Sequence, residues 1–180
     1  HTDPGGERLV DKFHDKNLYI IAVRDGLVVG MIAVHDRPPF SMTSRLPDPT
    51  VIDTLGEAVL EARLLSLSPG GRHEPVFFGL LWSVYRYARA SGRSHLLISG
   101  VEQRVAMYRR LGFRALGPPT RGGEAWFVPM AMSLTEIPPT MRAMIDRWER
   151  RVCVIPSPGP RSPLDSMHLS RRTRPQQPPP

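Results

Sequence analysis

The chain has 180 residues, which is enough to bury one sizeable hydrophobic core but short for two. It contains 24 lysines and arginines against 17 aspartates and glutamates, which gives a formal net charge of +7. The first 140 residues hold 16 basic and 14 acidic side chains, so most of the excess lies after Thr140. The basic character therefore belongs to the end of the chain, and we expect no nucleic acid partner.

Cysteine usage and hydropathy exclude several further classes. Cys153 is the single cysteine, which rules out a disulfide within the chain and a cysteine-rich zinc site. No apolar run approaches the roughly 18 residues that cross a bilayer, and no leader with a charged start and an apolar centre opens the chain. We expect a cytoplasmic protein without a membrane segment and without a bound metal.

The clearest local signal is a β-hairpin near the start. Two runs rich in β-branched residues, 18–24 and 27–35, flank the pair Asp25 and Gly26. An Asp-Gly pair between two such runs is typical of a tight hairpin turn. Prolines then break segment 36–45, which predicts a loop.

One long helix is expected over 76–90, where apolar residues recur at the three- and four-residue spacing of a helix packed on a sheet. Gly92 is expected to end it. The other expected elements, in chain order, are a short helix or irregular crossing over 51–60, strands over 61–67 and 95–99, a helix over 101–111, a strand over 113–116, a turn over 117–123, a strand over 125–134 and a helix over 141–152. This order predicts an α/β domain.

The chain is expected to divide into a domain over 1–155 and a tail over 156–180. The tail contains eight of the 20 prolines and few bulky apolar residues, so it cannot bury enough surface to offset the entropy of ordering. We predict a disordered tail or linker. A basic arm that binds phosphate through Arg171, Arg172 and Arg174 is the alternative.

A glycine-rich loop joins the third expected strand to the long helix. Gly70, Gly71 and Arg72 lead into a helix N-terminus, whose free backbone N–H groups and positive dipole end suit a diphosphate. An ordinary strand-to-helix turn explains the same residues equally well.

The segment Met107-Tyr-Arg-Arg-Leu-Gly-Phe113 carries a resemblance. With it, residues 18–134 resemble the GNAT N-acyltransferases, in which Tyr-x-x-Leu-Gly-Phe closes the second helix. In that family an Arg-x-x-Gly-x-Gly/Ala turn cradles the pyrophosphate of a pantetheine cofactor. The resemblance implies a central mixed sheet flanked by helices. It also implies that Tyr108 protonates the departing sulfur, although an aromatic ring that only packs the helix on the sheet is the alternative.

The chain departs from the general GNAT pattern in the phosphate turn. Pro75 and Phe77 stand where small residues are usual, so one N–H donor is missing and close backbone approach is limited. With segments 30–41, 61–65 and 127–130, these departures resemble the N-acyl amino acid synthase branch, whose relatives include the acyl-homoserine-lactone synthases. That branch implies an acyl donor on an acyl carrier protein or coenzyme A, and an amino acid or similar small amine as acceptor.

The resemblance also suggests which residues form the site. Attack of an amine on a thioester needs a base, donors for the oxyanion and an acid for the thiolate. Glu61 is assigned as the base, with a structural carboxylate paired to Arg63 as the alternative. Arg63, His35 and Asp36 are assigned to the acceptor, and a capped loop is the simpler explanation of His35 and Asp36. The residues assigned to the donor are Leu65, Ser66, Leu67, Arg72, His73, Val76 and Phe77.

Two functions therefore remain open from sequence. The first is an N-acyltransferase that moves an acyl group from a pantetheine thioester to an amine by direct attack. The alternative is a catalytically weak, GNAT-like module that senses a ligand or docks beside another enzyme. The family usually carries a strand and one or two helices before the hairpin, and residues 1–17 are too few for all of them. We accordingly expect a domain shortened at its front.

Overall fold

A computed structural model describes residues 11–69 and 73–151 of the chain. Within these ranges it contains seven strands, three α-helices and four short 3-10 helices, the latter named η. The strands are β1 Leu18–Arg24, β2 Leu27–His35, β3 Val59–Leu67, β4 His95–Val101, β5 Arg114–Ala115, β6 Thr120–Gly122 and β7 Ala125–Ser133. The helices are η1 His14–Lys16, η2 Ser41–Arg45, η3 Pro49–Leu55, α1 His73–Ala90, η4 Glu102–Arg104, α2 Val105–Arg110 and α3 Pro139–Arg151.

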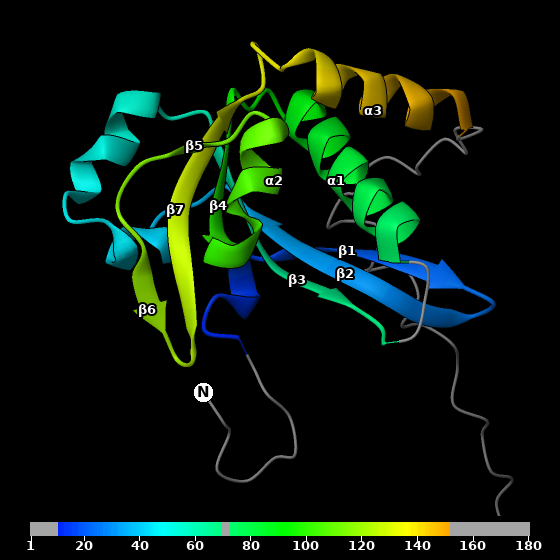
Figure 1. Ribbon diagram of the computed structural model, residues 1–180, viewed down its shortest axis with the longest axis horizontal. Coiled ribbons are helices and arrows are strands. Elements are labelled where there is room, and N and C mark those ends of the chain that lie inside the picture. The colour runs from blue at the N-terminus through cyan, green and yellow to red at the C-terminus, as the bar shows by residue number, and fades with distance from the viewer. Residues whose placement is uncertain (1–10, 70–72, 152–180) are drawn as a thin grey trace, which may run out of the picture.

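All seven strands belong to one mixed sheet (Figure 1). Its order is β1-β2-β3-β4-β7-β5, and β6 pairs with β7. The β3–β4 pair is parallel, because α1 carries the chain back from the end of β3 to the start of β4. The other pairs are antiparallel. A central mixed sheet flanked by helices is the architecture expected from the sequence, so the fold class is confirmed.

The hairpin of β1 and β2 turns at Asp25 and Gly26, as predicted. Both residues have positive φ, 52° for Asp25 and 76° for Gly26. Two consecutive left-handed residues give the turn a twist that matches the flanking strands. Aspartate and glycine tolerate this conformation better than other residues, which is why the pair is a reliable signal in sequence.

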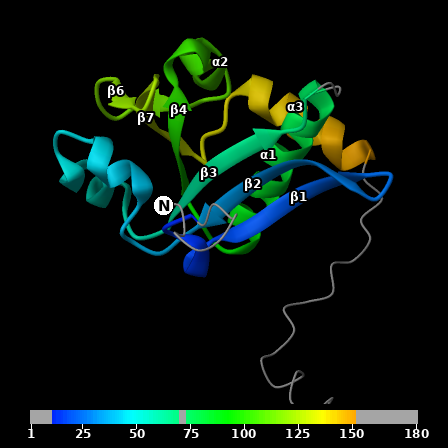
Figure 2. The same ribbon diagram turned by 90° about the horizontal axis from the view of Figure 1, so that it is seen from below.

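The parallel strands β3 and β4 separate along their length (Figure 2). Their register runs from Val59 opposite His95 to Ala62 opposite Ile98, yet both strands continue beyond these residues. A bulge lies in β3 where the register with β2 shifts, and Leu64 there has a φ of 54°. A leucine in the left-handed region costs about 1–2 kcal/mol. The bulge re-aims the end of β3 away from β4.

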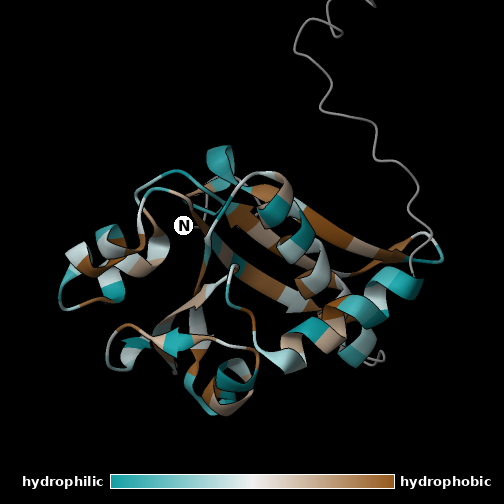
Figure 3. Cartoon of the chain, turned by 90° about the horizontal axis from the view of Figure 1, so that it is seen from above, coloured by the Kyte–Doolittle hydropathy of each residue, from teal (hydrophilic) through white to brown (hydrophobic). Residues whose placement is uncertain are grey.

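The main hydrophobic core lies between the sheet and α1, with α3 packed against α1 on the same side (Figure 1). In Figure 3 hydrophobic residues concentrate on the strands, whereas the outer helix α3 carries many hydrophilic ones. Met141 and Ile145 are the buried residues of α3, and Trp148 packs over Gly79 of α1. A second cluster fixes η2 and η3 against the sheet through Met42, Ile52 and Leu97, among others.

Several predicted boundaries need correction. The helix expected over 101–111 begins later, because Val101 is still paired with Phe127 in the sheet and η4 intervenes before α2. The segment 36–45 contains η2, the segment 51–60 divides between η3 and β3, and the turn 117–123 contains β6. These short elements are held by contacts with residues distant in sequence, such as Glu61 for η2 and β7 for β6, so local sequence patterns did not indicate them. The expected tail 156–180 and Cys153 lie outside the described residues.

Among the described residues, no helix combines the length and the apolar composition needed to cross a membrane.

The packing of α3 makes a testable prediction. Ile145 is 5% exposed and lies in the main core, so Ile145→Ala should lower the free energy of unfolding by about 2–5 kcal/mol, measured by urea denaturation. Asp146→Ala, at the exposed neighbouring position, serves as the control. A loss below about 1 kcal/mol for Ile145→Ala would show that α3 is not part of the cooperative core.

Candidate active site

A cavity of about 500 Å³ lies where β3 and β4 diverge. Its wall is mainly apolar and comes from both strands, from α1 and from α2. Apolar wall residues include Ile32, Leu65, Phe77, Leu81, Ile98 and Phe113. The polar and charged wall residues are Lys12, Ser41, Ser44, Arg45, Arg63, Ser99 and Tyr108. An apolar chamber with a few polar groups is the usual form of a small-molecule site.

Tyr108 lines the cavity from α2. The resemblance to the GNAT N-acyltransferases implied a role for this residue beside the reacting sulfur. Its ring lies on the backbone of β4 at Gly100, where a Cβ would come within 2.8 Å of the ring carbons Cδ2 and Cε2. The ring also meets Phe113 edge to face. Burial raises the pKa of the Tyr108 hydroxyl, and the nearby charge of Arg104 only partly offsets this. The hydroxyl therefore stays protonated at neutral pH and can donate a proton.

Glu61 is fully buried and does not line the cavity. Its carboxylate accepts hydrogen bonds from the Ser41 backbone N–H at 2.6 Å, the Ser41 hydroxyl at 2.7 Å and the Met42 N–H at 2.9 Å. Nε2 of His35 lies 2.9 Å from Oε2. Burial raises the pKa of Glu61, but contacts with His35, Ser41 and Met42 outweigh it and hold the pKa below its usual value. A buried carboxylate this well satisfied anchors the structure around it.

His35 and Asp36 are not part of the cavity wall. The ring of His35 is held between Phe13 and Phe40, and its Nδ1 lies 3.1 Å from the carbonyl oxygen of Arg37. Asp36 forms an ion pair with Arg93. The contacts of both side chains are those of a tethered loop, which the sequence left open as the alternative to acceptor binding.

Arg63 does line the cavity, but its partner is not Glu61. Nη1 of Arg63 lies 2.6 Å from the carboxylate of Asp11, and the guanidinium covers the ring of Phe13 at 4.4 Å. The sequence offered Glu61 as the partner because the two residues are two apart on one strand. Strand neighbours at this spacing share a face, yet the carboxylate of Glu61 is used by η2 and His35.

The residues expected to meet the donor fall into three groups. Leu65 and Phe77 line the cavity, and Leu65 to Leu67 follow the point at which the register with β4 ends. Val76 packs against Gly30 of β2 and not against the cavity. His73 begins α1, and Arg72 lies outside the described residues.

Sequence reasoning missed three wall residues, Ser41, Ser44 and Arg45, because it predicted segment 36–45 as a loop without a role. It also missed Phe127, whose ring lies 4.5 Å from the guanidinium carbon of Arg45. No spacing in the sequence links an arginine after β2 to an aromatic residue on β7. The pairing of β6 and β7 and the anchoring of η2 bring them together.

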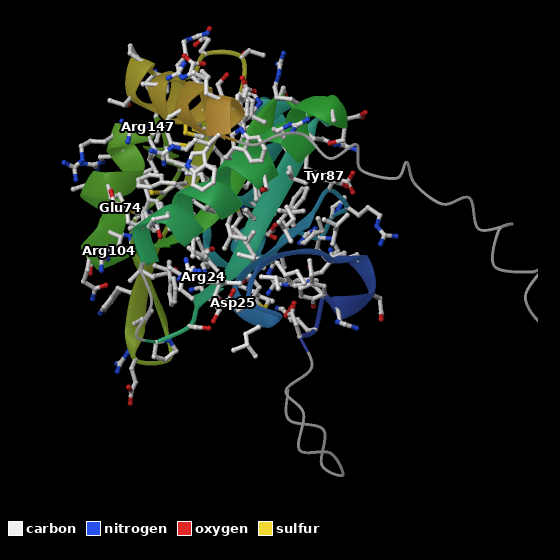
Figure 4. The ribbon with its side chains drawn as sticks, turned by 90° about the vertical axis from the view of Figure 1, so that its right-hand side faces the viewer. Arg24, Asp25, Glu74, Tyr87, Arg104 and Arg147 are labelled. Atoms are coloured by element: carbon white, nitrogen blue, oxygen red, sulfur yellow. The ribbon has the colours of Figure 1, made fainter. Side chains whose placement is uncertain are left out.

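A second groove, of about 510 Å³, lies between α1, α2 and α3 near the start of α1. Its wall includes Glu74, Arg110, Arg147 and Arg151. Figure 4 shows Glu74 and Arg147 on this side of the molecule, with Arg104 nearby. Within the described ranges, no three His, Cys, Asp or Glu side chains gather as a group that could hold a metal ion.

Comparison of the structure with solved structures identifies the fold. MesI, a CoA-dependent acyl-homoserine lactone synthase, superimposes with a TM-score of 0.63 and 17% identity, over 82% of this chain and 77% of that chain. FeeM, an N-acyl amino acid synthase from uncultured soil microbes, gives 0.57 and 17% over 67% and 74%. The chain has the GNAT-like acyltransferase fold. The resemblance inferred from sequence is thus confirmed at the level of the fold.

A third similar structure is BjaI, a CoA-dependent acyl-homoserine lactone synthase solved with SAM and isopentyl-CoA. It gives a TM-score of 0.61 at 18% identity, over 81% of this chain and 71% of that chain. No protein-family model and no curated protein matches the sequence. The likeness to known GNAT-like acyltransferases therefore rests on the three-dimensional arrangement.

The anchoring role of Glu61 predicts a pH-dependent stability. Glu61→Gln removes the charge and leaves buried N–H donors poorly satisfied, so we expect the free energy of unfolding at pH 7 to fall by about 1–3 kcal/mol. The pKa of Glu61 is lower in the folded protein than in the unfolded chain, so acid protonates the unfolded chain first.

The contribution of this carboxylate to the free energy of unfolding is consequently present above pH 4.5, the ordinary pKa of glutamate, and is lost as the pH falls below that value. The gap in unfolding free energy between wild type and Glu61→Gln should therefore shrink in acid. Urea denaturation from pH 7 to pH 3.5 measures it, with Glu136→Gln at an exposed position as the control. A gap that stayed constant across this range would contradict a charged anchor.

Proposed function

We propose that the protein is an N-acyltransferase that moves an acyl group from a pantetheine thioester to the amine of an amino acid or a similar small acceptor. The observation that carries this proposal is the cavity itself. It opens at the divergence of β3 and β4, is mainly apolar, and has the protonated hydroxyl-bearing residue Tyr108 in its wall. The GNAT-like fold supports the same reaction class.

The donor side fits a thioester on coenzyme A or on an acyl carrier protein. Beyond Ala62 the edge of β3 that faces β4 is no longer in register with it, so backbone groups there are free to pair with pantetheine amides. The neighbouring groove carries Arg110, Arg147 and Arg151 together with Glu74, and Figure 4 shows Arg147 and Glu74 on this side. Phosphates bind well to arginines. Both donors occur in the cytoplasm, which is the location that the proposal implies.

The charge of the cavity favours an amino acid over SAM as the acceptor. Three of its described wall residues are cationic, Lys12, Arg45 and Arg63, and none is an aspartate or glutamate. Asp11 pairs with Arg63 from outside the wall, so the positive charge of the wall comes mainly from Lys12 and Arg45. SAM and an amino acid both carry an ammonium and a carboxylate, but SAM also carries a sulfonium, so its net charge is +1 and a cationic wall disfavours it relative to a zwitterionic amino acid. The proposed activity is therefore closer to that of an N-acyl amino acid synthase, as FeeM is described, than to that of a lactone synthase.

The reaction proceeds by direct attack. The acceptor nitrogen bonds to the thioester carbonyl carbon, the C–S bond breaks, and the sulfur leaves with both electrons. Tyr108 supplies the proton that converts the thiolate to a thiol, since its raised pKa keeps it protonated. The acceptor attacks as its neutral amine, and as the C–N bond forms the attacking nitrogen loses one of its two protons to the hydroxyl of Ser41, which lines the cavity and passes its own proton to Glu61 at 2.7 Å. This route lets a buried carboxylate act as the base.

The direct test is release of free thiol when the protein meets acyl-CoA or acyl carrier protein thioesters together with a panel of amino acids. We expect acceptor-dependent release and an N-acyl amino acid detected by mass spectrometry. A folded protein that released no thiol with any pair would contradict the proposed function.

Loss of the acid should slow turnover without weakening donor binding. Tyr108→Phe keeps the ring over Gly100 and against Phe113, so we expect kcat to fall about 100-fold or more while KM for the donor changes little. Steady-state kinetics measure both. The control is Tyr87→Phe, on α1 and outside the cavity wall, whose kcat should match that of wild type. An unchanged kcat for Tyr108→Phe would show that Tyr108 is not the acid.

The relay through Ser41 makes a separate prediction. Ser41→Ala retains both backbone N–H bonds to Glu61 but interrupts the path from the cavity, so kcat should fall about 10- to 100-fold. Ser44→Ala is the matched control, because Ser44 lines the same cavity and its hydroxyl donates to the Ser41 carbonyl instead. Equal rates for the two variants would exclude the relay.

A further inference from the structure

We propose that Arg45 binds the carboxylate of the amino acid acceptor, and later that of the N-acyl product, at the edge of the cavity. The inference rests on the proposed function and assigns a substrate group to one residue of its site. It differs from the expectation based on sequence, which gave the carboxylate to Arg63.

Arg45 is held in place from both sides. Its guanidinium carbon lies 4.5 Å from the centre of the Phe127 ring, a cation–π distance. On the β6 side the guanidinium lies so close to Gly122 that an added Cβ would be 2.9 Å from Nη1 and 3.0 Å from Nη2. A planar group fixed in this way loses little further entropy when it binds a carboxylate.

The donors of Arg45 have no acceptor in the described part of the protein. No hydrogen bond or ion pair joins its guanidinium to residues 11–69 or 73–151, although a guanidinium offers five N–H donors. Arg45 is partly buried and lines the cavity. A positioned arginine with free donors in an apolar chamber is suited to a bidentate bond with a carboxylate.

The two other cations of the wall are less suited. Arg63 already contacts the Asp11 carboxylate at 2.6 Å, which neutralises its charge locally. Lys12 is exposed at the surface and lies over the ring of Phe13. A compact ammonium on a flexible stem gives weaker directional binding than a fixed guanidinium.

The anchor of η2 also orders the acceptor relative to the chemistry. Ser41 and Met42 are bonded to Glu61 at the start of η2, and Arg45 ends the same short helix and reaches toward β6 and β7. A carboxylate on Arg45 therefore sits at the far end of η2 from Ser41, the residue proposed to accept the amine proton. Because Ser41 and Arg45 are carried by the same short helix, their spacing limits how far apart the amine and the carboxylate of an acceptor can lie.

Binding of product analogues tests the inference independently of turnover. N-lauroylglycine and its uncharged amide, N-lauroylglycinamide, are titrated into wild type, Arg45→Gln and Gly122→Ala by calorimetry. Wild type should bind the acid at least about tenfold more tightly than the amide, since bonds to charged groups are the stronger ones. Arg45→Gln should reduce this preference to below about threefold, with affinity for the amide unchanged.

Gly122→Ala offers a second variant that leaves the arginine present. The added methyl would lie 2.9 Å from Nη1 of Arg45 and 3.0 Å from Cδ2 of Phe127, so it moves the guanidinium out of its place against the ring. Folding should be retained, because the end of the arginine side chain can shift, while the preference for the acid falls severalfold. Arg114→Gln is the control, because Arg114 is an exposed arginine of β5 that does not line the cavity. It should keep the wild-type preference.

The outcomes separate the two proposals. If wild type does not prefer the acid, or if Arg45→Gln and Gly122→Ala both keep the preference, the assignment of Arg45 is overturned. If wild type transfers acyl groups to amino acids and Arg45→Gln leaves KM for the amino acid unchanged, the assignment fails while the function stands. If no thiol is released with any acceptor but the preference depends on Arg45, the carboxylate site stands and the function fails.

Discussion

The arrangement of the site depends on one buried carboxylate. Removing Glu61 from water is unfavourable, and the cost is offset because its oxygens meet Ser41, Met42 and His35. These contacts tie β3 to β2 and to η2 at one point. Everything that η2 carries toward the cavity is therefore positioned by a charge that does not itself reach the cavity.

The cavity has a separate cause, the divergence of two parallel strands. The bulge at Leu64 shifts the register of β3 against β2 and directs its end away from β4. On the opposite wall, Gly100 has no side chain, and the ring of Tyr108 occupies the space that a Cβ there would need. The left-handed backbone of Leu64 is a local cost, and it lies at the point where the two strands part.

The charge of the cavity bears on the acceptor that we propose. GNAT-like structures that superimpose on the chain include acyl-homoserine lactone synthases and an N-acyl amino acid synthase, so the fold alone does not indicate which kind of acceptor is used. The cationic wall does bear on the choice, because acceptors of these two kinds differ in net charge. The basic excess of the whole sequence, most of which lies beyond Thr140, has no part in this argument.

The sequence by itself determined the hairpin, the long helix and the helix that carries Tyr108, and it indicated most of the strands in their order along the chain. Each of these follows from local signals: the Asp25-Gly26 turn, the apolar spacing over 76–90 and the segment that ends at Phe113. Only the tertiary structure decided the partner of Glu61, the pairing of Arg63 with Asp11 and the approach of Arg45 to Phe127. The physical reason is that local signals report backbone preference and burial, whereas a charged side chain takes whichever partner the folded chain brings within reach.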